Sequence, residues 1–286
     1  MVIKKLTPKK PKANMATDRI REAFEQARVE GRIALVPYVT VGFPEIDLTT
    51  DIVRAVVDGG ADVVELGVPF SDPLGDGPTI QASGHRALLN GVTPETCIAT
   101  AREIRGAGID VPIVFMGYYN NIFSRGLDEY CSRVSEAGVD GLIVADLPAQ
   151  EAGPLQDAAD RVGLGVIPLL ALTSTDEAIE HACARAAGFV YCISVLGVTG
   201  ARATMSERVE GLARNVRKYT GLPVAIGFGI SNACHVAEVA KYADGAVVGS
   251  ALIDRLADGD SAGAAERAGA YIRSLARGTS RKVVAN

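Results

Sequence analysis

The sequence predicts a (β/α)8 TIM barrel built as a single domain, preceded by one additional N-terminal helix. Short apolar runs alternate with amphipathic stretches about eight times over roughly 250 residues, which is the size and pattern of this fold. Most apolar runs are continuous and β-branched, as in parallel strands covered on both faces. No linker rich in Pro, Gly or Ser divides the 286 residues. A doubly wound open sheet is the structural alternative, although it usually has fewer strands and a switch-point site.

The first expected element is a helix over residues 17–30, which lies ahead of the first strand. Several of the amphipathic stretches between strands begin with Ser, Thr or Asp, the residues that cap helix N-termini. In chain order, the expected strands are the runs ALVPYVTV (34–41), VVEL (63–66), PIVFM (112–116), GLIVA (141–145), GVIPL (165–169), FVYC (189–192), PVAI (223–226) and GAVV (245–248). The expected helices between them include 47–58, 94–105, 127–137, 175–186 and 206–219.

The expected catalytic domain spans 16–276, between a disordered basic tail at 1–15 and a frayed tail at 277–286. The first tail lacks the apolar core of a signal peptide. The net charge is −5, and no basic stripe follows that tail, which argues against nucleic acid as a partner. No apolar run approaches the roughly 20 residues of a membrane span. Five scattered cysteines without CxxC spacing suit a reducing compartment, so a cytoplasmic location is expected.

Barrel active sites form at the carboxyl ends of the strands and in the loops that follow, which limits the chemistry available. None of the eight lysines lies on an expected strand, which argues against a Schiff-base lysine. The histidines His85, His181 and His235 fall in expected helices without ligand spacing, so no metal site is expected. Neither a nucleophile elbow nor a P-loop motif occurs. Carboxylates remain as candidate acid–base groups.

The stretch 63–81 passes from an apolar strand into a loop rich in Gly and Pro, and it carries several acids. Glu65 ends the strand among apolar neighbours, which should desolvate it and raise its pKa. Asp76 lies in the loop above, and two carboxylates in different surroundings can divide acid and base roles. The alternatives are a salt-bridged barrel residue for Glu65 and a turn former for Asp76. Asp72 and Asp146 are expected as turn or interface residues.

A second group of residues predicts an anion site. Gly229 follows the seventh expected strand, while Gly249 and Ser250 follow the eighth and open a helix. Backbone N–H groups at a helix start, approached closely because glycine lacks Cβ, form a cradle that needs no lysine. Barrel phosphate sites frequently use these two loops, and Gly200 in the sixth loop could add further amides. Tight turns alone are the alternative explanation for these glycines.

These motifs resemble those of the tryptophan synthase alpha subunit family over residues 17–276. The resemblance is carried by ELGVPFSDP (65–73) with DGPTIQ (76–81), YVTVGFP (38–44), GVTG (197–200), GFGIS (227–231) and VGS (248–250). It implies retro-aldol cleavage of indole-3-glycerol phosphate to indole and glyceraldehyde 3-phosphate in tryptophan biosynthesis. This lyase reaction requires no cofactor and no metal in the chain.

The resemblance also implies a role for each matched residue. Glu65 matches the acid–base group that protonates indole C3 and takes the glycerol hydroxyl proton, and Asp76 matches the carboxylate that stabilises charge at the indole N–H. The phosphate cradle matches Gly200, Gly229, Gly249 and Ser250, with Tyr191 nearby. Tyr38, Tyr118 and Ile80 match apolar contacts around the indole, and Thr199 matches a latch that closes the sixth loop over the second.

The family implies a partner, a beta subunit that carries pyridoxal phosphate, receives indole through a tunnel and forms an α2β2 tetramer. Pro69, Asp72, Asp146 and Pro148 match surfaces that face this partner. One departure is Val195-Leu196, where some members carry Arg-Ser in the sixth loop. Two alternatives stay open: a free-standing indole-3-glycerol-phosphate lyase, like the plant relatives, and a catalytically inert barrel kept as an allosteric subunit.

Overall fold

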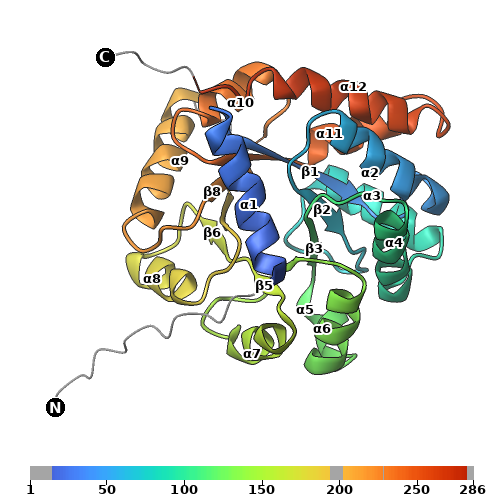
Figure 1. Ribbon diagram of the computed structural model, residues 1–286, viewed down its shortest axis with the longest axis horizontal. Helices are drawn as coiled ribbons and strands as arrows, with labels where there is room; N and C mark the ends of the chain where they lie inside the picture. The colour runs from blue at the N-terminus through green and yellow to red at the C-terminus, as the bar shows by residue number, and fades with distance from the viewer. Residues whose placement is uncertain (1–14, 194–201, 228, 282–286) are drawn as a thin grey trace.

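The computed structural model describes residues 15–193, 202–227 and 229–281 of the chain (Figure 1). The strands of these residues form one parallel sheet in the order β5-β4-β3-β2-β1-β9-β8-β7-β6. Their bounds are β1 Ala34–Thr40, β2 Val64–Gly67, β3 Ile113–Gly117, β4 Gly141–Val144, β5 Gly165–Val166, β6 Leu169–Ala171, β7 Val190–Ile193, β8 Val224–Gly227 and β9 Gly245–Val248.

The sheet closes into a ring because β5 and β6 are two halves of one stretch of chain. Pro168 divides this stretch, since proline has no N–H to donate to a neighbouring strand. The first half pairs with β4, where Ile167 N donates to Leu142 O at 2.9 Å, and the second pairs with β7, where Tyr191 N donates to Pro168 O at 3.0 Å. The predicted barrel is therefore confirmed, with one expected strand split in two, and the open doubly wound sheet is excluded.

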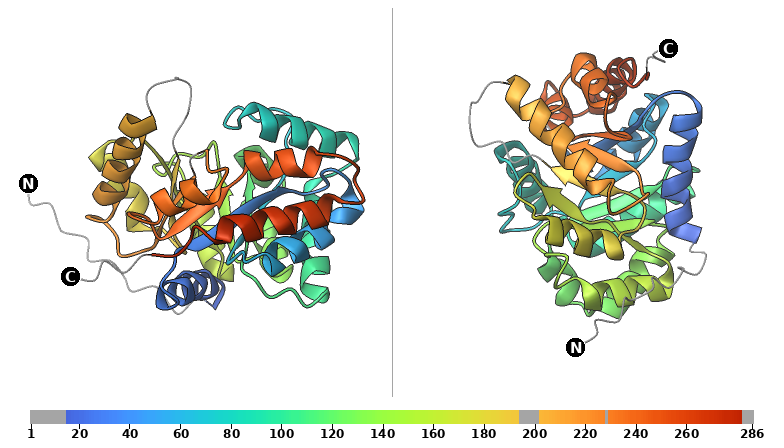
Figure 2. Two further views of the ribbon diagram at one scale, coloured as in Figure 1. Left: turned by 90° about the horizontal axis from the view of Figure 1, so that it is seen from above. Right: turned by 90° about the vertical axis from the view of Figure 1, so that its left-hand side faces the viewer.

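Helices surround the ring of strands on its outside (Figures 1 and 2). The second loop ends earlier than expected, because Pro78 occupies the first turn of a helix and has the backbone angle that suits this position. The bounds are α1 Met15–Val29, α2 Thr49–Asp58, α3 Pro78–Leu89, α4 Pro94–Gly106, α5 Tyr119–Phe123, α6 Leu127–Glu136, α7 Gly153–Val162, α8 Asp176–Ala184, α9 Arg202–Val216, α10 Ala233–Val239, α11 Ser250–Ala257 and α12 Ala264–Ala276.

Helix α1 closes the amino-terminal end of the barrel, and it lies across that end of the ring in Figure 1. Its buried side chains Ile20, Phe24 and Ala27 join the cluster of apolar side chains that fills the barrel interior. The rings of Phe24 and Phe189 are 5.2 Å apart. A Cβ at Gly245 would lie 2.7 Å from the Phe24 ring, so glycine at the start of β9 leaves the space that this helix occupies.

Three aspartates tie neighbouring strands together at the same end of the barrel. Asp62, Asp140 and Asp244 precede β2, β4 and β9, and each accepts a backbone N–H from the adjacent strand. Such a bond to a carboxylate is stronger than one between neutral groups. The three donors are Leu35 at 2.8 Å, Ile113 at 2.8 Å and Val224 at 3.0 Å.

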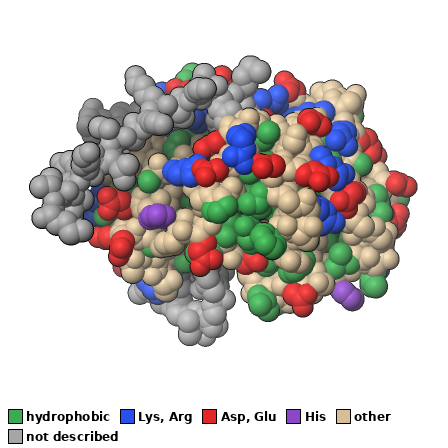
Figure 3. All heavy atoms as spheres, turned by 90° about the horizontal axis from the view of Figure 1, so that it is seen from below, with side chains coloured by type: hydrophobic (Ala, Val, Ile, Leu, Met, Phe, Trp, Pro, Cys, Tyr) green, Lys and Arg blue, Asp and Glu red, His purple; other side chains and the backbone are tan. Residues whose placement is uncertain are grey.

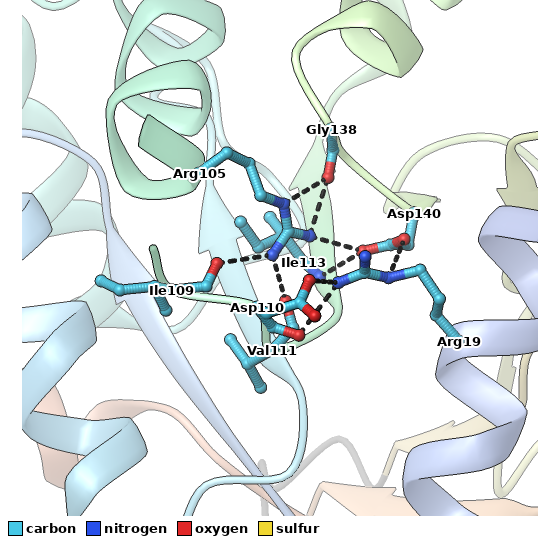
Figure 4. A network of polar contacts seen from close by, with 8 residues as sticks. All are labelled: Arg19, Arg105, Ile109, Asp110, Val111, Ile113, Gly138 and Asp140. Carbon is cyan, nitrogen blue, oxygen red and sulfur yellow. Dashed lines mark hydrogen bonds and ion pairs between the residues drawn. The ribbon is translucent and has the colours of Figure 1, made fainter. Parts of the chain in front are cut away.

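Asp140 is the centre of a network of ion pairs (Figure 4). Its carboxylate, which is 4% exposed, contacts the Arg105 guanidinium at 2.8 Å and the Arg19 guanidinium at 3.0 Å. Arg105 also donates to the carbonyl oxygens of Gly138 and Val111. Burial raises the pKa of the Asp140 carboxyl, while the Ile113 N–H and the two guanidinium groups oppose that rise. The network links α1 and α4 to the start of β4.

We expect Arg105→Met to lower the free energy of unfolding by about 3–5 kcal/mol, because removal of one partner leaves buried acceptors uncompensated. Urea unfolding monitored by circular dichroism measures this change. Arg185→Met is the matched control: its partners Asp157 and Asp160 are largely exposed, so the loss should stay below about 1 kcal/mol. Equal losses in the two variants would contradict a structural role for the buried network.

The chain after α12 returns to the amino end of the barrel. Thr279 O accepts from Ile33 N at 2.9 Å, and Arg281 N donates to Gly31 O at 2.8 Å. Of the segment 277–286, expected to be frayed, the structure describes only 277–281; most of the expected 1–15 tail also lies outside the described residues.

The outer surface carries mixed charges. Acidic and basic side chains lie intermingled on the face shown in Figure 3. Exposed ion pairs join neighbouring helices, as between Arg161 of α7 and Asp128 of α6 and between Arg185 and Asp160 of α7. Among the described residues, no helix has the length and apolar character needed to cross a membrane.

Candidate active site

A cavity of about 370 Å³ lies at the carboxyl end of the barrel strands. It brings together residues from the second βα loop and from the loops after β8 and β9, as the sequence predicts. The predicted site residues that line it are Tyr38, Glu65, Asp76, Ile80, Tyr191, Gly229, Gly249 and Ser250.

Glu65 lies on β2 with its side chain facing the cavity, and it is 1% exposed. Neither carboxyl oxygen has a hydrogen-bond partner among the described residues. Burial, helped by the negative charge of Asp76, raises the pKa of this carboxyl to about 8. The side chain is therefore mainly protonated near neutral pH. No ion pair to Glu65 occurs within the described residues, so the structure does not favour the salt-bridged alternative.

Asp76 lies in the loop between β2 and α3, on the rim of the same cavity. Burial raises its pKa to about 6, and the Tyr118 hydroxyl opposes this rise by hydrogen bonding to the carboxylate. Near neutral pH the Asp76 side chain is mainly ionised. The cavity thus presents one neutral acid and one carboxylate, the arrangement that general acid catalysis with charge stabilisation requires.

Tyr118 is not among the residues that line the cavity, and its expected contact with the indole stays a prediction. Its hydroxyl contacts the second loop, where it accepts from Gly75 N at 3.0 Å. Its ring stacks on Phe70 with centroids 5.1 Å apart. Tyr118 therefore holds the segment that carries Asp76. The sequence places Tyr118 just after β3 but does not show which neighbouring loop its hydroxyl contacts.

Two buried tyrosines extend into the cavity over glycines of adjacent strands. A Cβ at Gly67 would lie 2.0 Å from the Tyr38 hydroxyl oxygen, and a Cβ at Gly227 would lie 2.5 Å from that of Tyr191. Glycine at each strand end is therefore needed for the neighbouring ring. Burial raises the pKa of both phenols well above their usual range, so both stay neutral.

The opposite wall of the cavity carries exposed backbone amides. Gly229, two residues beyond the end of β8, has a φ of 46°, a conformation that favours glycine. Gly249 is the N-cap of α11 and Ser250 is its first residue, with no side chain capping the helix. Within the described residues, no bond is shown for the N–H groups of Ser250 and Ala251, which suit an anion that the helix dipole also favours.

Several further residues line the cavity that sequence reasoning did not assign. Met116 ends β3, a position where barrel side chains face the site, so its place after an apolar run was a usable signal. Whether each of the other residues lines the cavity depends on the direction in which its loop or helix leaves the barrel. The sequence pattern does not specify that direction. The additional residues are Met116, Gly227, Ile230, Ser231, Val247, Ala251 and Asp254.

The remaining predicted residues lie outside the cavity or outside the described chain. Thr199 and Gly200 fall within 194–201, which the structure does not describe. Pro69, near the start of the second loop, is buried, whereas Asp72 and Pro148 are exposed. Asp146 is exposed and accepts from Tyr119 N at 2.7 Å. No cluster of His, Cys, Asp and Glu able to hold a metal occurs among the described residues.

Comparison with known proteins identifies the family. The family model for the tryptophan synthase alpha chain matches residues 24–280. The tryptophan synthase alpha chain of Chloroflexus aurantiacus is 48% identical over 257 residues, which is 90% of this chain and 97% of that protein. The crystal structure of tryptophan synthase subunit alpha from Legionella pneumophila has a TM-score of 0.83 and 32% identity, covering 91% of this chain and 97% of that one. A chain of Mycobacterium tuberculosis tryptophan synthase has a TM-score of 0.84 and 35% identity, with coverages of 92% and 99%. The chain belongs to the tryptophan synthase alpha chain family.

Proposed function

We propose that this chain is the alpha subunit of a tryptophan synthase and cleaves indole-3-glycerol phosphate to indole and glyceraldehyde 3-phosphate. The observation that carries the proposal is a buried, unpaired Glu65 beside Asp76 in a cavity whose far wall offers backbone amides. The cavity of about 370 Å³ has apolar surfaces for a flat heterocycle and a polar end for a phosphate.

In the proposed reaction, Glu65 acts first as an acid. The protonated carboxyl donates its proton to indole C3, which forms a C–H bond and leaves a positive charge on the ring. The resulting carboxylate then takes the proton of the glycerol hydroxyl next to the ring. As that oxygen becomes the aldehyde carbonyl, the carbon–carbon bond breaks and its electron pair returns to the indole ring. A pKa of about 8 suits both steps, because the group must give and take a proton near neutrality.

Asp76 and the amide wall hold the two ends of the substrate in this scheme. The Asp76 carboxylate accepts the indole N–H and stabilises the positive charge that C3 protonation creates. Amides at Gly229, Gly249 and Ser250 bind the phosphate, with Gly200 as a further member. Tyr38, Tyr191 and Ile80 contact the indole and glycerol portions. Closure of the second and sixth loops, with Thr199 as the latch, excludes water from the reacting atoms.

The proposed partner is a beta subunit that carries pyridoxal phosphate and forms an α2β2 complex with this chain. Pro69, Asp72, Asp146 and Pro148 are the proposed contacts. Two large exposed apolar side chains support a docking face there: Leu74, in the same loop as Asp72, is 93% exposed, and Phe123, at the end of α5 after β3, is 63% exposed. The free cysteines are consistent with a reducing, cytoplasmic location.

Turnover of indole-3-glycerol phosphate, measured for the full chain alone and with a beta subunit, tests the proposal. Indole release that rises strongly when the beta subunit is added is the expected result. High indole release from the isolated chain that the beta subunit leaves unchanged would instead identify a free-standing lyase. No indole release in either condition would identify a catalytically inert subunit.

Ser250→Asp should raise the KM for indole-3-glycerol phosphate by at least about tenfold with little change in kcat, because a carboxylate would repel the phosphate in both ground and transition states. Steady-state kinetics in the complex measure both constants. Ser250→Ala is the matched control and should raise KM much less, since the backbone amide stays in place. A fall in kcat at constant KM would contradict phosphate binding at this helix.

A further inference from the structure

The loop after β8 forms part of the amide wall, and side chains from outside the cavity fix its position. Gly229, Ile230 and Ser231 of this loop line the cavity. The Tyr271 hydroxyl, from α12, donates to Ser231 O at 3.1 Å. On the other side, Ser231 N donates to the ring nitrogen Nδ1 of His235 at 3.3 Å. Both backbone groups of Ser231 are therefore bonded by side chains that are not themselves in the lining.

Helix α12 also contacts α11, the helix whose first residues form the second part of the amide wall. The Arg255 guanidinium of α11 lies over the Tyr271 ring, 5.6 Å from its centroid. Arg267 of α12 donates to the carbonyl oxygen of Arg255 at 3.1 Å. One side chain, Tyr271, thus contacts the β8 loop through its hydroxyl and α11 through its ring.

We infer that Tyr271 is a positioning residue for phosphate recognition, which it serves by fixing the distance between the β8 loop and the start of α11. The inference rests on the proposed function, because it assumes that these two segments bind the substrate phosphate. Hydrogen bonds from backbone N–H groups weaken steeply when distance or angle departs from the optimum. Two separately mobile loops would therefore bind a phosphate more weakly than two loops joined through a common side chain.

The chemistry of Tyr271 suits this role. Burial raises the pKa of its phenol, so the hydroxyl stays a donor to the Ser231 carbonyl through the physiological range. The ring face turned toward Arg255 provides a cation–π contact, which tethers α11 without blocking the N–H groups at its other end. Phenylalanine at this position would keep the ring contact and remove only the bond to the loop.

Tyr271→Phe, tested in the full chain with its beta subunit, separates positioning from folding. We expect the KM for indole-3-glycerol phosphate and the Kd of glycerol 3-phosphate to rise about fivefold. The kcat and the Kd of indole, which has no phosphate, should stay within about twofold of the wild-type values. Arg255→Gln should change the same two constants in the same direction. Tyr219→Phe, in the turn after α9 and outside the cavity lining, is the matched control and should change neither.

The outcomes distinguish this inference from the proposed function. If the wild-type chain neither binds glycerol 3-phosphate nor cleaves the substrate, both fail. If the wild type binds glycerol 3-phosphate, and Tyr271→Phe leaves the KM of the substrate and the Kd of glycerol 3-phosphate unchanged, the positioning role alone is overturned. A fall in kcat without a rise in KM, or an equal weakening of indole binding, would overturn it as well. The same unfolding midpoint in Tyr271→Phe and Tyr219→Phe would show that the altered constants do not reflect a general loss of stability.

Discussion

Glu65→Gln should reduce kcat for indole formation by about 10²–10⁴-fold while the chain folds and binds its beta subunit normally. Glutamine has the same shape but cannot give a proton to indole C3 or take one from the glycerol hydroxyl. Stopped-time assays of indole with the purified complex measure the loss. Glu103→Gln, on the exposed side of α4, is the matched control and should keep full activity. Full activity in Glu65→Gln would refute the acid–base role.

The same substitution has an effect on stability that depends on pH. The pKa of Glu65 is raised from 4.5 to about 8 by burial and by Asp76, so the folded state disfavours the ionised form. The wild type should therefore lose stability relative to Glu65→Gln as pH rises from about 4.5 to about 8, and the difference should level off above that range. Denaturant unfolding of the two proteins across this interval tests the sign. A difference independent of pH would show that Glu65 is not desolvated as described.

Asp76→Asn should lower kcat by about 10²–10³-fold with a small change in KM, because asparagine keeps the shape but loses the charge that balances the protonated indole. The wild-type pH profile should be bell-shaped. Activity rises through about pH 6 as Asp76 ionises and falls through about pH 8 as Glu65 loses its proton. The apparent pKa values of the two limbs belong to the interacting pair of acids rather than to either acid alone.

In Asp76→Asn the acidic limb of this profile should disappear while the alkaline limb remains. Rate measurements from pH 5 to pH 9 on both proteins make the comparison. Asp58→Asn, an exposed change at the far end of α2, is the control for loss of one negative charge. If KM rose and kcat stayed constant, Asp76 would contribute to binding rather than to charge stabilisation.

The barrel could be predicted because its strands are continuous apolar runs, and such runs identify strands without any knowledge of their neighbours. The acidic site could be predicted for a similar reason: the apolar neighbours of Glu65 in the sequence already imply its desolvation. The place of Gly249 and Ser250 followed from the repeat itself, since a strand end that leads into a helix start recurs at each step around the barrel.

The rest depends on contacts that the local sequence does not specify. The division of one strand at Pro168 reflects the pairing of its halves with two different neighbours, β4 and β7. The bond from Gly75 N to the Tyr118 hydroxyl joins residues 43 apart in sequence, so the local pattern could not indicate it. Ser231 and Tyr271 are 40 residues apart in sequence and meet only because α12 packs behind α11 and α10. The roles expected for Thr199 and Gly200 stay predictions, because both residues lie outside the described part of the chain.

Helix α1 determines the route by which product can leave. Among the described residues, Ile20, Phe24 and Ala27 close the amino end of the ring and apolar side chains fill its centre, beneath the cavity at the carboxyl end. The packed side chains described at the amino end leave indole formed beside Glu65 to depart at the carboxyl end, where the cavity lies. In the described part of the chain, Leu74 of the second loop and Phe123 at the end of α5 are exposed large apolar side chains. A barrel closed at its amino end would therefore release its product toward whatever covers the carboxyl end.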